Sequence, residues 1–192
     1  MKRFRRLDSS GASAAEFAMV LPILLLFIFG MIDAGRFMWE FNRAEKATQM
    51  GVRYAAVADM VPATLATYNF ALSDGIPGGD PVPTANFSST LCNTTSCTGS
   101  WGYSATAFDN IWNRMRQMYP PIRDTNVTVE YTNVGLGYAG DPIGPDVAPL
   151  VTVRLTGMTF RPVTGMLFGV TFPMPDFAAA MTLEDGSGTV SN

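Results

Sequence analysis

Glu16 occupies a position that needs a chemical explanation. It lies directly before residues 17–32, an uncharged apolar run, and a carboxylate at the edge of a membrane-spanning segment is costly. Gly11 stands five positions earlier in the stretch GASAAEF. A cut after Gly11 would give Ala12 a free α-amino group and make Glu16 the fifth residue of the shortened chain. An ammonium and a carboxylate in a low dielectric are less costly as a pair than alone, so such a cut would create a charge with which a membrane-edge carboxylate could pair.

The apolar run is preceded by a basic leader. Its positive charge predicts that the N-terminus stays in the cytoplasm and that the chain beyond the run is exported; the basic residues are Lys2, Arg3, Arg5 and Arg6. As a helix the run covers roughly 24 Å, somewhat less than the ~30 Å core of a bilayer. Asp33 ends the run, and Arg36 can reach back to the membrane surface. We therefore expect residues 12–35 to span the membrane once.

Three kinds of N-terminal segment combine a basic leader with an apolar run. A secretory signal peptide has a small-residue cleavage site after the run, whereas this chain continues in a helical pattern with only weak sites. A plain signal anchor gives no reason for the spacing of Gly11 and Glu16. A prepilin-type signal is cut before the run, after a glycine, with glutamate at the fifth mature position. The sequence favours this third kind, with Gly11, Ala12, Glu16 and Phe17 as the processing site.

Residues 10–58 resemble the N-terminal region of TadE-like proteins, which are minor pilins or pseudopilins of the tight-adherence (Flp-type) pilus system. The matching motifs are Glu16-Phe17, Val20-Leu21-Pro22, Gly30, Asp33, Gly35 and Arg36. The remaining two thirds resemble the family only loosely. The resemblance implies a bacterial inner-membrane protein with a periplasmic C-terminal domain. It also implies four partners: the lipid bilayer, a prepilin peptidase, other pilins and inner-membrane assembly platform proteins.

The partner of Glu16 is left open by the sequence. On a rigid helix the Ala12 amino group and the Glu16 side chain are about one turn apart, roughly 6 Å. Pairing with the amino group of a neighbouring subunit is therefore expected, as is inferred for type IV pilins. Glu16 could equally serve as a recognition element for the peptidase, or could simply reach the membrane surface.

The processing site must be carried by a long helix. From about residue 13 to residue 58 only Pro22 interrupts a helical pattern, and we expect a kink there because proline removes one helical hydrogen bond. Beyond the membrane, small or apolar residues recur on one helix face: Phe37, Phe41, Ala44, Thr48, Gly51, Ala55 and Ala58. This stripe predicts packing against the exported domain. The charges opposite, including Glu40 and Arg43, are expected to be solvated.

The rest of the chain predicts a small α+β domain of the kind that the pilin resemblance implies. Residues 72–104 are rich in Gly, Pro, Ser and Thr, which predicts a long surface loop. An apolar face predicts a helix over residues 105–119, and a shorter helix or turn is expected within residues 162–169. Antiparallel strands are expected from Val127, Val151 and Phe177 onward. The expected organisation is a leader (1–11), a membrane segment (12–35), a helical continuation (36–60), an α+β domain (61–184) and a disordered tail (185–192).

Composition argues against catalysis. The absence of histidine removes Ser-His-Asp chemistry and His-ligated metals. The aspartates of the Gly/Pro-rich loops are typical turn residues, and no glycine-rich phosphate loop precedes a helix. With 13 basic and 16 acidic residues, nucleic-acid binding is also disfavoured. We expect no enzyme, no cofactor, no metal and no nucleic-acid partner.

Cys92 and Cys97 lie in the polar stretch CNTTSC. Two cysteines make a poor metal site, and the spacing is not that of a redox C-x-x-C motif. A local disulfide is expected if the domain is exported to an oxidising compartment; the alternative is two solvent-facing thiols.

The function predicted is that of a minor pilin or pseudopilin, processed by a prepilin peptidase and supporting pilus assembly. The alternative is a single-pass anchored binding or structural module that never enters a fibre. The sequence does not distinguish TadE from TadF. It also does not give a position in the fibre, a surface ligand or an oligomeric state.

Overall fold

The computed structural model describes residues 9–184 and Gly186. Most of the expected leader and, apart from Gly186, the expected tail lie outside the described residues. The chain divides into two compact units. Unit 1 comprises Met1–Trp39 with Thr159–Phe172, and unit 2 comprises Glu40–Met158 with Pro173–Asn192. The domain boundaries expected from the sequence stay predictions.

A single long helix, α1 (Ser9–Val57), contributes to both units. It confirms the uninterrupted helical pattern and continues through Pro22, where the kink stays a prediction. In unit 2 the first residue of the predicted stripe, Phe41, is half-buried, and the rest are buried: Ala44, Thr48, Gly51, Ala55 and Ala58. The small residues of this stripe let neighbouring elements approach the helix axis closely.

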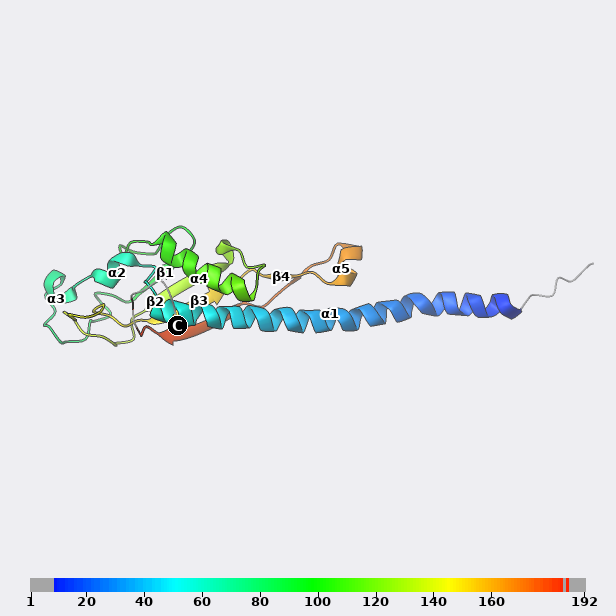
Figure 1. The fold of residues 1–192 in the computed structure, drawn as a ribbon, viewed down its shortest axis with the longest axis horizontal. Helices are drawn as coiled ribbons and strands as arrows, with labels where there is room; N and C mark the ends of the chain where they lie inside the picture. The colour runs from blue at the N-terminus through cyan, green and yellow to red at the C-terminus, as the bar shows by residue number, and fades with distance from the viewer. Residues whose placement is uncertain (1–8, 185, 187–192) are drawn as a thin grey trace, which may run out of the picture. The chain divides into compact units, whose positions relative to one another are not determined.

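Unit 2 is built on a four-stranded antiparallel sheet in the order β1-β2-β3-β6. The strands are β1 (Ser89–Cys92), β2 (Val127–Thr132), β3 (Leu150–Leu155) and β6 (Phe177–Thr182). Val129 pairs with Val153, and Val153 pairs with Ala179. Alternate residues of β2 and β3 are buried, as expected for a sheet with one face on the core. The three predicted strands and the α+β class are confirmed (Figure 1).

The predicted second helix is α4 (Ala105–Met118). The Ser104 hydroxyl accepts a hydrogen bond from the Ala107 N–H and so caps its first turn. Its buried face is Ala107, Phe108, Ile111 and Met115. The shorter helices of unit 2 are α2 (Ala63–Thr67), α3 (Phe70–Ser73) and the 3₁₀ turn η1 (Asp124–Asn126).

The segment expected to be a long surface loop is partly core, so that prediction was wrong over residues 82–92. The structure places strand β1 there, and Val82, Phe87, Thr90 and Cys92 are buried. Asn133 stabilises this segment because its side-chain amide donates to the carbonyls of Val82 and Phe87. A buried carbonyl needs such a partner.

In unit 1 the chain outside α1 forms a hairpin, here called the α5 hairpin (residues 159–172). It contains β4 (Thr159–Phe160), the short helix α5 (Val163–Phe168) and the start of β5 (Phe172–Pro173), which pairs with β4. Gly169 ends α5 with φ 71°, a left-handed conformation that glycine adopts without strain. The short helix expected within residues 162–169 is confirmed.

Candidate processing and membrane-anchoring site

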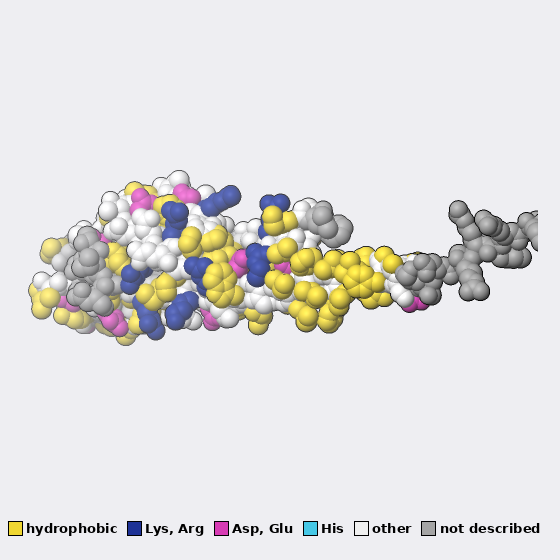
Figure 2. All heavy atoms as spheres, turned by 45° about the vertical axis from the view of Figure 1, so that its right-hand side comes forward, with side chains coloured by type: hydrophobic (Ala, Val, Ile, Leu, Met, Phe, Trp, Pro, Cys, Tyr) yellow, Lys and Arg dark blue, Asp and Glu magenta, His cyan; other side chains and the backbone are white. Residues whose placement is uncertain are grey.

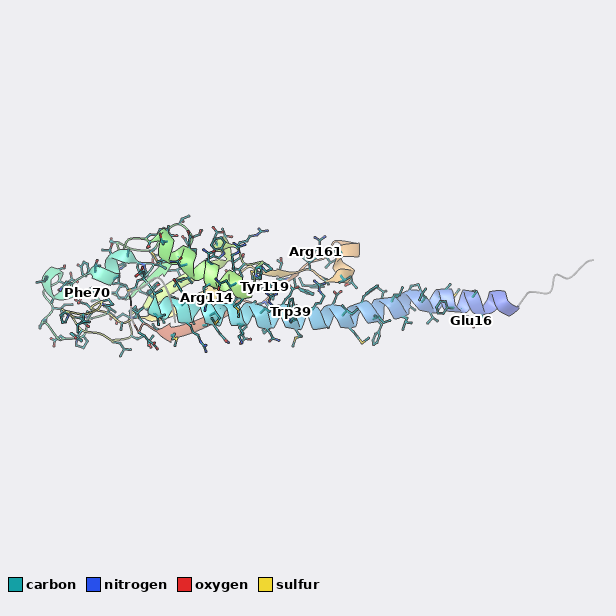
Figure 3. All side chains as sticks on the ribbon, viewed as in Figure 1. Glu16, Trp39, Phe70, Arg114, Tyr119 and Arg161 are labelled. Atoms are coloured by element: carbon teal, nitrogen blue, oxygen red, sulfur yellow. A yellow bond between two sulfur atoms is a disulfide. The ribbon has the colours of Figure 1, made fainter. Side chains whose placement is uncertain are left out.

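The predicted processing residues lie at the N-terminal end of α1. Gly11, Glu16 and Phe17 are exposed, and a methyl group built on Gly11 would meet no atom within 4 Å (Glu16 is labelled in Figure 3). The Gly11–Ala12 bond falls in the first turn of α1, where the backbone N–H groups have no intrahelical partners. Opening this turn for a peptidase would therefore break few hydrogen bonds. The roles assigned to these residues stay predictions.

The apolar run of residues 17–32 is exposed to its surroundings along nearly its whole length. Met19 and Ile23 are 77% and 71% exposed. Figure 2 shows hydrophobic side chains along the visible face of this part of α1. Within the described residues, α1 is the one helix long and apolar enough to cross a membrane. So continuous an apolar surface marks contact with lipid or with another protein.

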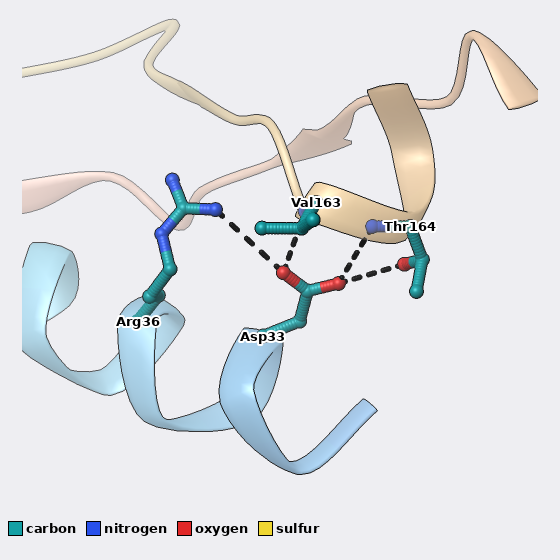
Figure 4. Close-up of polar contacts among 4 residues, drawn as sticks. All are labelled: Asp33, Arg36, Val163 and Thr164. Carbon is teal, nitrogen blue, oxygen red and sulfur yellow. Dashed lines mark hydrogen bonds and ion pairs between the residues drawn. The ribbon is translucent and has the colours of Figure 1, made fainter. Parts of the chain in front are cut away.

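Asp33, directly after this run, is buried, and both oxygens of its carboxylate accept hydrogen bonds (Figure 4). Its Oδ1 accepts a hydrogen bond from the Val163 N–H at 2.6 Å and lies 3.6 Å from an Arg36 guanidinium nitrogen. Its Oδ2 accepts hydrogen bonds from the Thr164 N–H at 3.0 Å and from the Thr164 hydroxyl at 2.7 Å. The carboxylate therefore caps the first turn of α5, where Pro162 offers no side-chain cap.

Sequence reasoning placed Asp33 only at the end of the apolar run and missed this role. The partners lie 130 and 131 residues further along the chain, a separation that no local pattern reveals. A signal was nevertheless present, because a short helix that begins after Pro162 without a capping side chain needs an acceptor from elsewhere.

Aromatic packing continues the contact between α1 and the α5 hairpin. The rings of Phe37 and Phe160 meet edge to face, with centroids 5.3 Å apart. The Arg36 guanidinium lies 5.6 Å from the centroid of the Phe160 ring, within the range of a cation–π contact. The hairpin is thus attached to α1 by both polar and apolar contacts within unit 1.

Comparison with known families bears on this same stretch of α1. Residues 11–53 match the model of a family described as TadE-like protein. The chain is similar to TadE-like proteins over these residues, which are called here the TadE-like region. The match covers the processing residues, the apolar run and Asp33, but less than a quarter of the 192 residues. No curated protein and no solved structure matched the chain.

The TadE-like region continues into unit 2, where it carries a second polar contact. The Arg43 guanidinium donates two hydrogen bonds to the carbonyl of Met118, the last residue of α4, at 2.9 and 2.6 Å. The Tyr119 hydroxyl donates to the Glu40 carboxylate at 3.2 Å. The expectation that Glu40 and Arg43 are simply solvated was therefore wrong, because the end of α4 leaves carbonyls that need donors.

This contact changes the acidity of Tyr119. Burial, reinforced by the charge and the hydrogen bond of Glu40, raises the pKa of Tyr119 to about 12, while Arg43 acts in the opposite direction. Tyr119 therefore stays a hydrogen-bond donor over the physiological pH range.

The cysteines lie at one edge of the sheet, outside the TadE-like region. Cys92 ends β1 and is joined to Cys97 by a disulfide. The enclosed turn is held by the Asn93 side chain, which accepts from the N–H groups of Thr95 and Ser96. Among the described residues no group of three or more His, Cys, Asp or Glu side chains is placed to hold a metal ion.

Proposed function

We propose that this chain is a pilin-like subunit of a tight-adherence pilus system, anchored in the bacterial inner membrane by α1 and processed between Gly11 and Ala12. The proposal rests on the close spacing of two features at the start of α1. The TadE-like match begins at Gly11, and the exposed apolar helix surface begins just after Glu16.

The proposed sequence of events follows from charge and hydropathy. The basic leader holds the N-terminus in the cytoplasm while the apolar run enters the bilayer. A prepilin peptidase then cuts after Gly11, which removes four basic residues and one acidic residue and changes the formal net charge from −3 to −6. The new ammonium at Ala12 pairs with Glu16 of a neighbouring subunit, because each charge alone is costly near lipid. The processed subunit then supports pilus assembly as a minor pilin.

Mass spectrometry of the mature N-terminus tests the processing step. We expect the full chain, expressed with a prepilin peptidase, to begin at Ala12. Gly11→Leu should keep Met1, because a bulky side chain replaces the glycine at the cut. Gly30→Leu is the matched control: it lies on the same helix, where an added side chain meets no atom within 4 Å, and it should be cleaved normally. An intact wild-type N-terminus would instead indicate an anchored module that does not enter a fibre.

Glu16→Gln separates the two roles proposed for Glu16. Loss of cleavage would assign Glu16 to recognition by the peptidase. Normal cleavage with loss of the subunit from purified pili or their assembly complex would assign it to ion pairing. If both cleavage and incorporation were intact, neither role would hold.

A further inference from the structure

We propose that the α5 hairpin is a second membrane-contacting element. It lies in the headgroup and upper acyl region of the bilayer that α1 crosses, in the leaflet that faces the exported domain. This inference rests on the membrane-spanning role proposed for α1. The occupant of the hairpin's exposed face is lipid rather than another protein chain.

The first argument is depth. Phe160 contacts Phe37, whereas Val163 and Thr164 contact Asp33. Between these contacts the hairpin moves four residues toward the N-terminus of α1, about 6 Å along the helix axis. The hairpin therefore descends toward the apolar run, and its helix α5 begins at the level where that run ends.

The position of Trp39 supports the same depth. Trp39 is 58% exposed on α1, one turn after Arg36. Tryptophan and arginine near the end of an apolar span are typical of the membrane–water interface. With the headgroups at this level, α5 lies just inside them.

The second argument is the chemistry of the exposed face. Four apolar side chains of the hairpin are 37–64% exposed: Val163, Met166, Val170 and Phe172. The sequence of residues 159–175 contains no acidic residue. Arg161 is exposed at the base of α5 (Figure 3), where a cation suits anionic lipid headgroups. An exposed apolar face with a basic residue beside it suits a segment that lies in the membrane interface.

The third argument is the state of the hairpin's backbone, because unpaired N–H groups are costly in lipid. The first two N–H groups of α5 donate to Asp33. The N–H of Met166 donates to Pro162, and that of Val170 donates to Gly165. Asp33 is itself surrounded by donors and Arg36, so the burial of its charge beside lipid is compensated.

Depth-dependent fluorescence quenching tests the proposal on the full chain. Single cysteines are introduced at Met166, at Ile23 in the apolar run and at Leu72 in unit 2, where the side chain is 86% exposed. Cys92 and Cys97 are bonded to each other and do not take the label. Each variant carries the fluorophore NBD and is reconstituted at low protein-to-lipid ratio in phosphatidylcholine–phosphatidylglycerol vesicles. The quenchers are lipids with a nitroxide at the headgroup, high on the acyl chain or deep in it.

We expect the label at position 166 to be quenched most by the headgroup and upper-chain nitroxides. The label at position 23 should respond most to the deep nitroxide, and the label at position 72 to none. If position 23 were unquenched, the membrane-spanning role of α1 would be wrong. If position 23 were quenched while position 166 behaved like position 72, the hairpin would not touch lipid and only the further inference would fail. A blue-shifted but unquenched label at position 166 would show a protein occupant and would also overturn the inference.

Discussion

Asp33 shows how one side chain joins distant parts of the sequence. An ionised carboxylate next to an apolar run is unfavourable unless donors surround it. Here the donors come from the backbone and side chain of Thr164, from the backbone of Val163 and from Arg36. The same contacts supply the missing cap of α5. The charge and the helix end thus stabilise each other.

Asp33→Asn is expected to loosen the α5 hairpin. Asparagine has nearly the same shape, but it is neutral and replaces one acceptor oxygen by a donor, so it cannot accept all the bonds made by the carboxylate. Amide hydrogen exchange at Val163 and Thr164 should accelerate roughly tenfold or more, as measured on the full chain in detergent. Asp176→Asn, at an exposed aspartate of unit 2, is the matched control and should leave this exchange unchanged. Unchanged protection in the Asp33 variant would contradict the capping role.

The difference between Glu16 and Asp33 shows what residue-level reasoning could predict. The argument for Glu16 depends on its spacing from Gly11 and on the adjacent apolar run, and both features are local. The partners of Asp33 come from a segment 130 residues away. Only the fold brings that segment to the helix, so its role could not be predicted from neighbouring residues.

At the scale of elements, the part of α1 in unit 2 is a core helix whose small residues allow close packing. A methyl group built on Gly51 would lie 2.7 Å from Met115 Cγ and 3.4 Å from Val153 Cγ1. The helix therefore lies against α4 and β3 at a distance that leaves no room for a side chain at this position. The close packing that glycine allows at this position outweighs the cost of its poor helix propensity.

Gly51→Ala is expected to destabilise unit 2. Overpacking lowers the free energy of unfolding by about 1–3 kcal/mol. The better helix propensity of alanine offsets up to about 1 kcal/mol of this loss. The net loss should be about 1 kcal/mol in the free energy of unfolding, measured by urea titration with tryptophan fluorescence. Gly35→Ala is the matched control, because an added methyl there meets no atom within 4 Å, and it should not lower the stability of unit 2. Equal stability of the Gly51 variant and wild type would show that Met115 moves aside without cost.

Periodicity determined which elements could be predicted. The helices α1 and α4 and the strands β2, β3 and β6 carry clear patterns of apolar residues and were expected. Strand β1 was missed because Ser89–Cys92 lies in a stretch rich in serine, threonine and glycine. Its strand state comes from pairing with β2, for example Thr90 with Tyr131, and this long-range contact overrides the local composition.

At the scale of the whole molecule, folding changes how many protons the chain binds at alkaline pH. Burial raises the pKa of Tyr131, and burial with nearby Asp109 and Asp124 raises the pKa of Tyr103. The pKa of Tyr119 is raised to about 12, mainly by burial. The folded state therefore keeps these tyrosines protonated at pH values where the unfolded chain has begun to lose its protons.

The free energy of unfolding is expected to fall as pH rises from about 10 to about 12. In this window the unfolded state binds fewer protons than the folded state, so increasing pH favours unfolding. The contribution of Tyr119 is fully present below its ordinary pKa of about 10 and is lost as pH passes through about 12. Tyr119→Phe should show a shallower fall between pH 9 and pH 11.5 in urea titrations. A slope identical to that of wild type in the Tyr119 variant would contradict the prediction.

The contact between Asp33 and the α5 hairpin also has a consequence in time. Ribosomes synthesise the partner residues 130 positions after Asp33. In the proposed topology the apolar run is thus delivered to the membrane when Arg36 is present but the hairpin donors of Asp33 are not, and the remaining acceptor sites of its carboxylate must stay hydrated at that stage. In that topology the helix should reach its final depth only when the α5 hairpin has been exported and has folded back onto it. We therefore expect membrane insertion to be completed only by the folding of the α5 hairpin, and a nascent chain truncated before residue 163 should rest in the bilayer at a different depth.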